Sequence, residues 1–190
     1  MKVVRSLALS AIVGFSFLQG ANYNVDTSHS DVGFKVKHMM ISNVRGNFEK
    51  FSGTFSLNEE TKHFSSITGT VQVASLTTQD AKRDGHLKSG DFFDVEKYPQ
   101  MYLQLIKQER SRGAFELTIK GITEVVTLDI EEVSATVKDP WGNTRLAFEL
   151  HGRINRKDYN MNFNEALETG GLLVGDTVKF DILLEGIQTK

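Results

Sequence analysis

The stretch FELTIKGITEVVTLDIE, residues 115–131, decides the fold because apolar and polar residues alternate through both of its halves. Every second residue of 115–119 is apolar, and the same holds for 126–130. Successive side chains of a β-strand point to opposite faces, so a period of two indicates a strand with one buried face and one solvated face. The stretch therefore predicts two neighbouring strands joined by a short connection.

Six other segments of the chain repeat this pattern: 32–38, 51–57, 67–73, 101–105, 146–150 and 178–184. Eight strands in mostly meander order are enough for an antiparallel sheet to close on itself, although a two-sheet sandwich would alternate in a similar way. The barrel is favoured because the inward face is large and apolar, and because glycines occur inside strand patterns, where a strongly curved sheet bends. These glycines are Gly33, Gly53, Gly69 and Gly152. We therefore expect an all-β fold, an eight-stranded antiparallel barrel.

Two segments interrupt the strands. Asp80 follows Thr77 by three residues, which is the spacing of a capping box and predicts a short helical insertion at about residues 77–90. A second short helical piece is expected near 164–168, before Gly170 and Gly171. With no internal repeat and no linker of biased composition, residues 22–190 are expected to form one domain.

The N-terminus has the parts of a secretory signal peptide. Lys2 and Arg5 precede an uncharged, mostly apolar run at 7–18, and small residues follow at Gly20 and Ala21. The alternative is a buried N-terminal helix. We expect residues 1–21 to be removed and the mature protein to be periplasmic or secreted, without a transmembrane anchor, because no second run is long enough to span a bilayer.

Composition excludes several classes of protein. The 190 residues include 22 Lys and Arg against 24 Asp and Glu, a formal net charge of −2 that argues against nucleic acid as a partner. Cysteine is absent, so disulfides, thiolate catalysis and thiolate metal sites are excluded. No nucleophile elbow, phosphate loop or dinucleotide fingerprint is present, and no two histidines have metal-ligand spacing. We therefore predict no cofactor, no metal site and no catalytic residues.

Two short runs are rich in polar groups, at 83–88 and at 155–158. Each can be read as a solvated surface or as a polar site beside a barrel mouth, where barrel ligands are usually met.

Eight motifs, in this order and spacing, resemble the YceI-like family of exported, lipocalin-like, polyisoprenoid-binding proteins. They are 23–26 with His29-Ser30, 34–38, 44–48, 83–87, 91–94, Tyr98-Pro99, 120–123 and 154–159. The chain departs from the family pattern at Glu124-Val125, where a basic residue and Pro are common, and at Asn160, where Gly is common. Asn tolerates a positive φ better than most residues, so the turn at Asn160 is expected to survive.

The resemblance implies a hollow lipocalin-like barrel that binds one long-chain amphiphilic lipid, such as an isoprenoid, quinone-like or fatty-acyl derivative, without catalysis. It also links the chain to stress responses. Together with the alternation, it predicts a ligand tunnel lined by Phe34, Val36, Phe48, Phe55, Ile67, Met101, Leu103, Phe115, Leu117, Phe148 and Phe180. Residues of the family motifs that lie at strand ends or on the inserted helix are expected to contact the polar headgroup: Asp26, His29, Arg83, Asp84, Asn155 and Arg156.

Three alternatives stay open. The protein could instead be an enzyme acting on an amphiphilic lipid with His29, His38, Asp84 or His86 as acid, base or metal ligand. Asp84 and Arg156 could form a structural ion pair that fixes the helix to the barrel. The sequence does not determine the oligomeric state, and a homodimer is allowed.

Overall fold

The structure, a computed structural model, describes residues 20–168 and 170–189. The expected signal peptide lies almost wholly outside this part of the chain. Within the described ranges there are twelve strands, one α-helix, α1 (Ala81–Lys88), and two 3-10 helices (Val73–Ser75 and Arg156–Tyr159). The strands are β1 (Ala21–Val25), β2 (Asp31–His38), β3 (Ser42–Phe48), β4 (Phe51–Asn58), β5 (His63–Gln72), β6 (Leu76–Thr77), β7 (Gln100–Glu109), β8 (Arg112–Ile119), β9 (Ile122–Glu131), β10 (Val137–Lys138), β11 (Thr144–Asn155) and β12 (Val174–Gln188).

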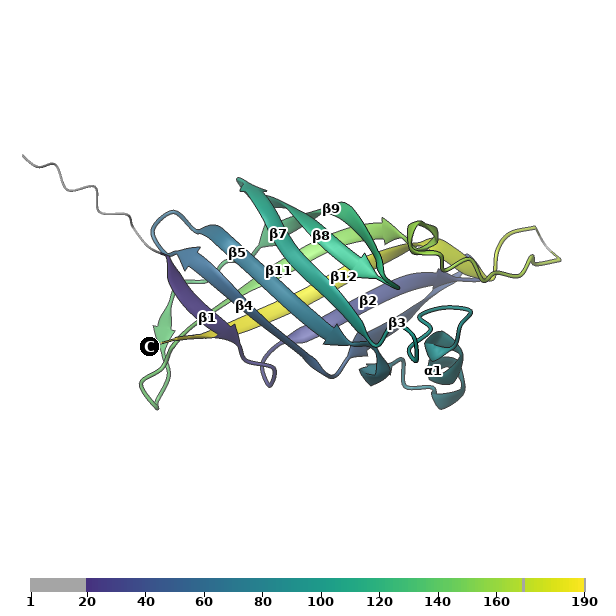
Figure 1. The fold of residues 1–190 in the computed structure, drawn as a ribbon, viewed down its shortest axis with the longest axis horizontal. Coiled ribbons are helices and arrows are strands. Elements are labelled where there is room, and N and C mark those ends of the chain that lie inside the picture. The colour runs from purple at the N-terminus through teal and green to yellow at the C-terminus, as the bar shows by residue number, and fades with distance from the viewer. Residues whose placement is uncertain (1–19, 169, 190) are drawn as a thin grey trace, which may run out of the picture.

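The strands form a closed antiparallel barrel, as expected. The ring runs β11-β9-β8-β7-β5-β4-β1-β12 and returns to β11, because the long strand β12 pairs with β11 on one side and with β1 on the other. Beyond the end of β1, β2 continues along β12, β3 pairs with β2, and β6 pairs with β3. The barrel is therefore elongated, with α1 at the end formed by β2 and β3 and the C-terminus at the other end (Figure 1).

All eight predicted segments are strands of this barrel, namely β2, β4, β5, β7, β8, β9, β11 and β12. The sequence pattern missed β1, β3 and the two-residue strands β6 and β10. In β3 the alternation is hidden because Gly46 occupies an inward position, where a Cβ would lie only 2.6 Å from Cζ of Phe34. The ring of Phe34 fills the place of the missing side chain.

The predicted helical insertion is present, but it begins at Ala81 rather than near Thr77. Asp80 is the N-cap itself: its side chain accepts a hydrogen bond from the backbone N–H of Arg83 (3.0 Å). The helical piece expected near 164–168 was wrong. The Asn164 side chain bonds both the N–H and the C=O of Val174, and Ala166 bridges Leu172, so this segment forms an irregular hairpin.

Inside the barrel, the half near the C-terminus is solidly packed. Its centre is an aromatic group in which the ring centroids of Phe55 and Phe148 lie 5.0 Å apart and those of Phe64 and Phe148 lie 4.5 Å apart. Tyr23 stacks on Phe55 at 4.9 Å. Edge-to-face and offset contacts of this kind stabilise a core beyond the apolar area that they bury. The packed half therefore closes one end of the bore.

Candidate ligand-binding site

A cavity of about 720 Å³ occupies the other half of the barrel, at the end next to α1. Its wall includes the paired glycines Gly53 and Gly69 on neighbouring strands. At Gly69, an added Cβ would meet its nearest neighbours, Cβ of Leu103 and the backbone oxygen of Ser52, only at 3.9 Å. At Gly53 a Cβ would lie 2.6 Å from the backbone oxygen of Thr68, so the open space at this pair of glycines lies at Gly69.

Eight of the expected tunnel residues lie on the cavity wall: Phe34, Val36, Phe48, Ile67, Met101, Leu103, Leu117 and Phe180. The other three, Phe55, Phe115 and Phe148, do not. They are at most 1% exposed and belong to the packed half, where they face the same interior but contact other core side chains. The cavity is therefore shorter than the tunnel that the sequence predicts.

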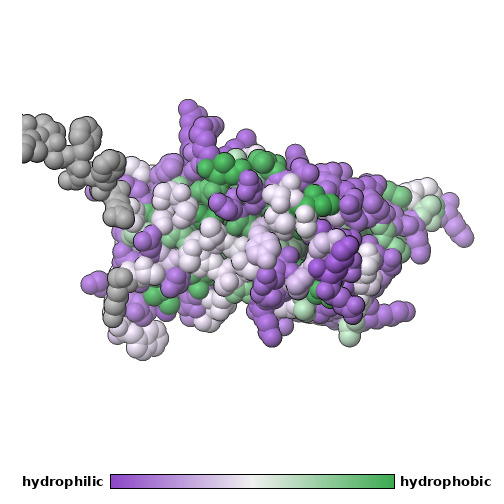
Figure 2. Space-filling model, viewed as in Figure 1, coloured by the Kyte–Doolittle hydropathy of each residue, from purple (hydrophilic) through white to green (hydrophobic). Residues whose placement is uncertain are grey.

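The mouth of the cavity carries both aromatic and polar side chains. Phe92, Phe93 and Phe163 line the mouth, and the first two belong to the motif at 91–94 that resembles the family. The polar lining at this end consists of Lys37, His38, Asp80, Lys82, Arg83, His86 and Arg156. Seen from the side shown in Figure 2, the outer surface is mostly hydrophilic, with apolar patches above β7 to β9.

Of the six expected headgroup residues, Arg83 and Asp84 lie together beside the mouth and share one partner, Thr78. Arg83 donates from Nε to the Thr78 hydroxyl (2.7 Å) and from Nη2 to the Thr78 carbonyl (2.9 Å). Asp84 accepts from the Thr78 N–H (2.8 Å) and hydroxyl (2.5 Å). Burial alone would raise the pKa of Asp84, but these hydrogen bonds outweigh it and lower the pKa. The network attaches α1 to Thr78, the residue that follows β6.

Arg156 lines the same cavity but is only 2% exposed. It donates to the backbone carbonyls of Gly175 (3.0 Å) and Met161 and forms an ion pair with Asp176 (3.1 Å). Its partner is therefore Asp176, and within the described residues no ion pair with Asp84 is present, which overturns that alternative. Asn155 accepts from the Lys157 N–H (3.1 Å) as the cap of the following 3-10 helix and does not line the cavity.

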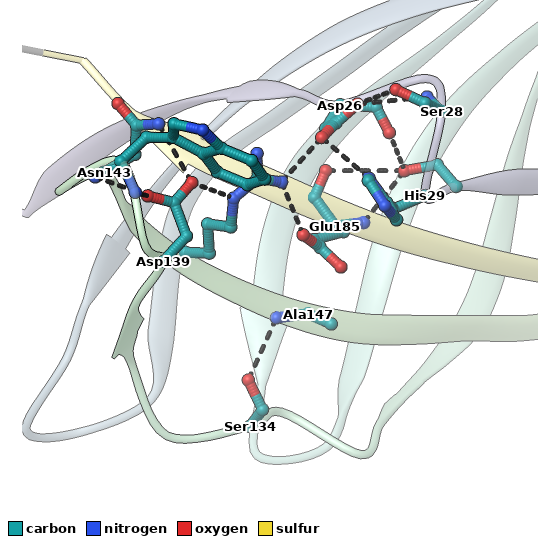
Figure 3. Close-up of polar contacts among 11 residues, drawn as sticks. Asp26, Ser28, His29, Ser134, Asp139, Asn143, Ala147 and Glu185 are labelled. Carbon is teal, nitrogen blue, oxygen red and sulfur yellow. Dashed lines mark hydrogen bonds and ion pairs between the residues drawn. The ribbon is translucent and has the colours of Figure 1, made fainter.

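Asp26 and His29 belong to a different cluster, at the other end of β12 (Figure 3). Asp26 accepts from His29 (3.0 Å) and from Arg145 (2.6 Å), and Arg145 also donates to Glu185 (2.7 Å) and Asp139 (2.7 Å). The backbone N–H of Asp26 bonds Glu185, eleven positions along β12 from Val174 at the mouth, or about 35 Å along an extended strand. Arg145 lies in none of the motifs identified in the sequence, so sequence analysis did not single it out.

This cluster could be taken for a metal site, because ligand atoms of Asp26, His29 and Glu185 lie within 4.8 Å of one another. One guanidinium nitrogen of Arg145 already bonds both carboxylates. The positive charge of Arg145 therefore occupies the position that a cation would take.

The residues considered for catalysis do not form one group. His29 lies in the Arg145 cluster, whereas His38 and His86 lie at the mouth of the cavity. His86 contacts Asp91 through Nε2 (2.8 Å), and the oxygen Oδ1 of Asp84 is engaged by Thr78. The arrangement at the cavity is suited to holding an apolar molecule with its polar end at the mouth. Within the described part of the chain, no helix has the length and apolar character needed to span a membrane.

Comparisons with known proteins agree with this architecture. The family model described as "YceI-like domain" matches residues 23–186. The "UPF0312 protein SA2479" of Staphylococcus aureus strain N315 is 36% identical over 167 residues, covering 86% of this chain and 96% of that protein.

Solved structures show the same fold. The YceI protein of Campylobacter jejuni is 32% identical, with a TM-score of 0.68 over 87% of this chain and 96% of that one. A domain of Saccharophagus degradans described as polyisoprenoid-binding is 16% identical, with a TM-score of 0.64 over 90% and 99% of the two chains, and shows the fold alone. These matches, which extend over nearly all of the barrel, show that this chain belongs to the YceI-like family.

Proposed function

We propose that this protein is a non-catalytic carrier that holds one long-chain amphiphilic lipid, of isoprenoid, quinone-like or fatty-acyl type, in the cavity of the barrel. The observation that carries the proposal is the cavity of about 720 Å³, with apolar walls contributed by most of the barrel strands. This volume is within the range of about 300–1,000 Å³ that small-molecule sites usually occupy.

The energetics fit a chain-like ligand. Each methylene moved from water into an apolar bore gains about 0.8 kcal/mol, so a long chain binds well with few polar contacts. The packed aromatic half closes the far end, and the polar groups lie at the mouth, so the apolar tail enters first. Lys82, Arg83 and His86 are the polar side chains of α1 that line the cavity, and we expect them to contact the polar end of the lipid.

The family supports the same conclusion. The Saccharophagus degradans domain of this fold is described as polyisoprenoid-binding, and the motifs that relate this chain to the family extend over the cavity wall and α1. We also propose that the protein is exported to the periplasm or the medium. There it would carry through water a lipid that water does not dissolve.

The test is to fill the cavity from one position. Gly69→Phe places a ring in the bore, where an added Cβ meets nothing closer than 3.9 Å, so the fold is expected to survive. A fluorescent long-chain fatty acid, added to the protein as monomer, should bind the wild type and lose at least about tenfold in affinity to Gly69→Phe, a change of about 1.4 kcal/mol.

The matched control is Thr54→Phe, which adds the same ring on the exposed outer face of the neighbouring strand β4. Its affinity should equal that of the wild type. Equal binding by Gly69→Phe and Thr54→Phe, with both folded, would show that the fatty acid does not occupy the bore.

A further inference from the structure

The turn between β2 and β3 presents large apolar side chains to solvent. Met39, Met40 and Ile41 are 40%, 58% and 81% exposed. Leu172, on the loop before β12, is 37% exposed, and a Cβ added at the neighbouring Gly171 would lie 3.8 Å from Cγ of Met40. We call Met39, Met40, Ile41 and Leu172 the apolar tip.

The backbone of this turn is unfavourable for the residues it carries. The N–H of Ile41 donates to the carbonyl of His38 (3.1 Å), and the two central residues, Met39 and Met40, have φ of 50° and 64°. Asn and Gly are the residues that turns with two positive φ values prefer, whereas a bulky side chain there is strained. The chain therefore keeps methionines where Asn-Gly would be more stable, and strain of this kind indicates a role outside folding.

The apolar tip is joined directly to the mouth of the cavity. The N–H of Met39 donates to the carbonyl of Leu173 (2.8 Å), and Leu173 and His38 both line the cavity. In the view of Figure 1, the β2–β3 turn and the loop before β12 project beyond the barrel at the end that carries α1. A surface that touches the tip also meets the opening through which a ligand enters.

Charges of both signs lie on the elements that surround the mouth of the cavity. Lys37 and Lys82 are exposed on the side of β2 and α1, and Glu165 and Glu168 are exposed on the loop before β12. A strongly anionic or cationic partner is not favoured by this mixture. Exposed apolar side chains on a rigid turn, with few net charges around them, suit the interface of a lipid bilayer.

From these observations we propose that the apolar tip inserts into the surface of a lipid bilayer and brings the mouth of the cavity against it, so that the lipid passes between membrane and barrel without crossing water. This inference rests on the carrier function proposed above. It adds the partner, a bilayer surface, and the residues that contact it.

The experiment measures how fast the protein is loaded from vesicles. A fluorescent long-chain fatty acid is placed in phosphatidylcholine vesicles, and transfer to excess protein is followed in time. For the wild type, the loading rate should rise with vesicle concentration, because transfer occurs in collisions. The double substitution M39N/M40G, which suits the turn, should lower this rate about fivefold or more, since insertion depends on buried apolar area, without lowering Tm.

Ile41→Ser is the second variant, since it leaves the turn residues unchanged, and it should also load more slowly. The double substitution M39L/M40L should retain the wild-type rate. Trp141→Ser is the control, because Trp141 is 81% exposed but lies before β11, at the opposite end of the barrel.

A parallel titration with the fatty acid added as monomer separates the two proposals. Unchanged monomer affinity in M39N/M40G, together with slow loading from vesicles, supports the apolar tip. Unchanged affinity with wild-type loading in both M39N/M40G and Ile41→Ser overturns it and leaves the carrier standing. Failure of the wild type to bind the monomer overturns the carrier and, with it, this inference.

Discussion

Single glycines decide whether the barrel interior is full or empty. Gly186, in the packed half, has an aromatic ring in the space of its missing side chain: a Cβ there would lie 2.3 Å from Cζ of Phe55 and 3.0 Å from Cβ of Tyr23. At Gly69, in the hollow half, the nearest atoms of the described residues would lie 3.9 Å from an added Cβ. The same residue type thus allows close packing at one site and an open bore at the other.

This difference predicts the stability of two alanine variants. Gly186→Ala should lower the free energy of unfolding by about 1–3 kcal/mol, the usual cost of overpacking a core. Gly69→Ala should stay within about 0.5 kcal/mol of the wild type, because it adds a methyl group to open space. Chemical denaturation of both variants measures this, and equal losses would show that the two halves do not differ in packing.

At this scale the sequence predicts which face a residue occupies but not what lies opposite it. Phe148 and Phe180 both belong to alternating segments, and both point inward. Only the structure shows that Phe148 is packed among Phe55 and Phe64, whereas Phe180 borders the cavity. Alternation predicts which face of a strand a side chain occupies. Whether the interior at that point is packed or hollow depends on the side chains of all the strands together.

At the scale of elements, the side chain of Arg145 on β11 fixes two loops to the barrel wall. It joins Asp26 in the β1–β2 loop, Asp139 in the turn before β11 and Glu185 on β12. The side chains of Arg145, Asp26 and Asp139 are only 7–15% exposed. Burial would raise the pKa of Asp139, but hydrogen bonds from Arg145 and Asn143 outweigh it and lower the pKa from 3.8 to about 2.

Arg145→Gln should therefore lower Tm by several degrees at neutral pH, since three carboxylates lose their shared cation. The matched control is Lys107→Gln, which removes an exposed ion pair with Glu109 and should leave Tm nearly unchanged. A wild-type Tm in Arg145→Gln would contradict the role given to Arg145.

The wild type and Arg145→Gln also test how stability depends on pH. A carboxyl whose pKa is lower in the folded state stabilises the fold above its unfolded pKa, and this contribution is lost as pH falls through the folded pKa. For Asp139 that window runs from 3.8 down to about 2, and hydrogen bonds from Ser28, Arg145 and His29 lower the pKa of Asp26 as well. Stability of the wild type should fall more steeply than that of Arg145→Gln across this window in acid unfolding experiments. Parallel curves would exclude the linkage.

Strands were predicted correctly where the alternation of apolar and polar residues was long. The helix prediction failed where one side chain, that of Asn164, determines the local structure. The eight strands could be identified because each contains several alternating residues. The helix near 164–168 could not be excluded, because the amide of Asn164 satisfies backbone groups of Val174, ten residues away, and such a contact leaves no local signal. Asp26 and Arg156 were grouped because both follow strands, yet strand ends occur at both ends of a barrel.

For the whole molecule, the proposal requires that the barrel reaches the compartment outside the cytoplasm. The mature chain should begin near residue 22, since a basic start, an uncharged run and small residues precede this point. N-terminal sequencing of protein recovered from the periplasm or medium of its native host measures this. A soluble, mature form that still begins at Met1 would contradict export.

The division of the barrel into a packed half and a hollow half is the central feature of the molecule, and the proposed carriage of a lipid depends on it. Native mass spectrometry of protein purified without detergent from its host tests this. The account predicts one long-chain amphiphile per wild-type chain and per Thr54→Phe chain, and none in folded Gly69→Phe. Wild-type protein without lipid, even after incubation with a host lipid extract, or lipid retained equally by Gly69→Phe, would contradict it.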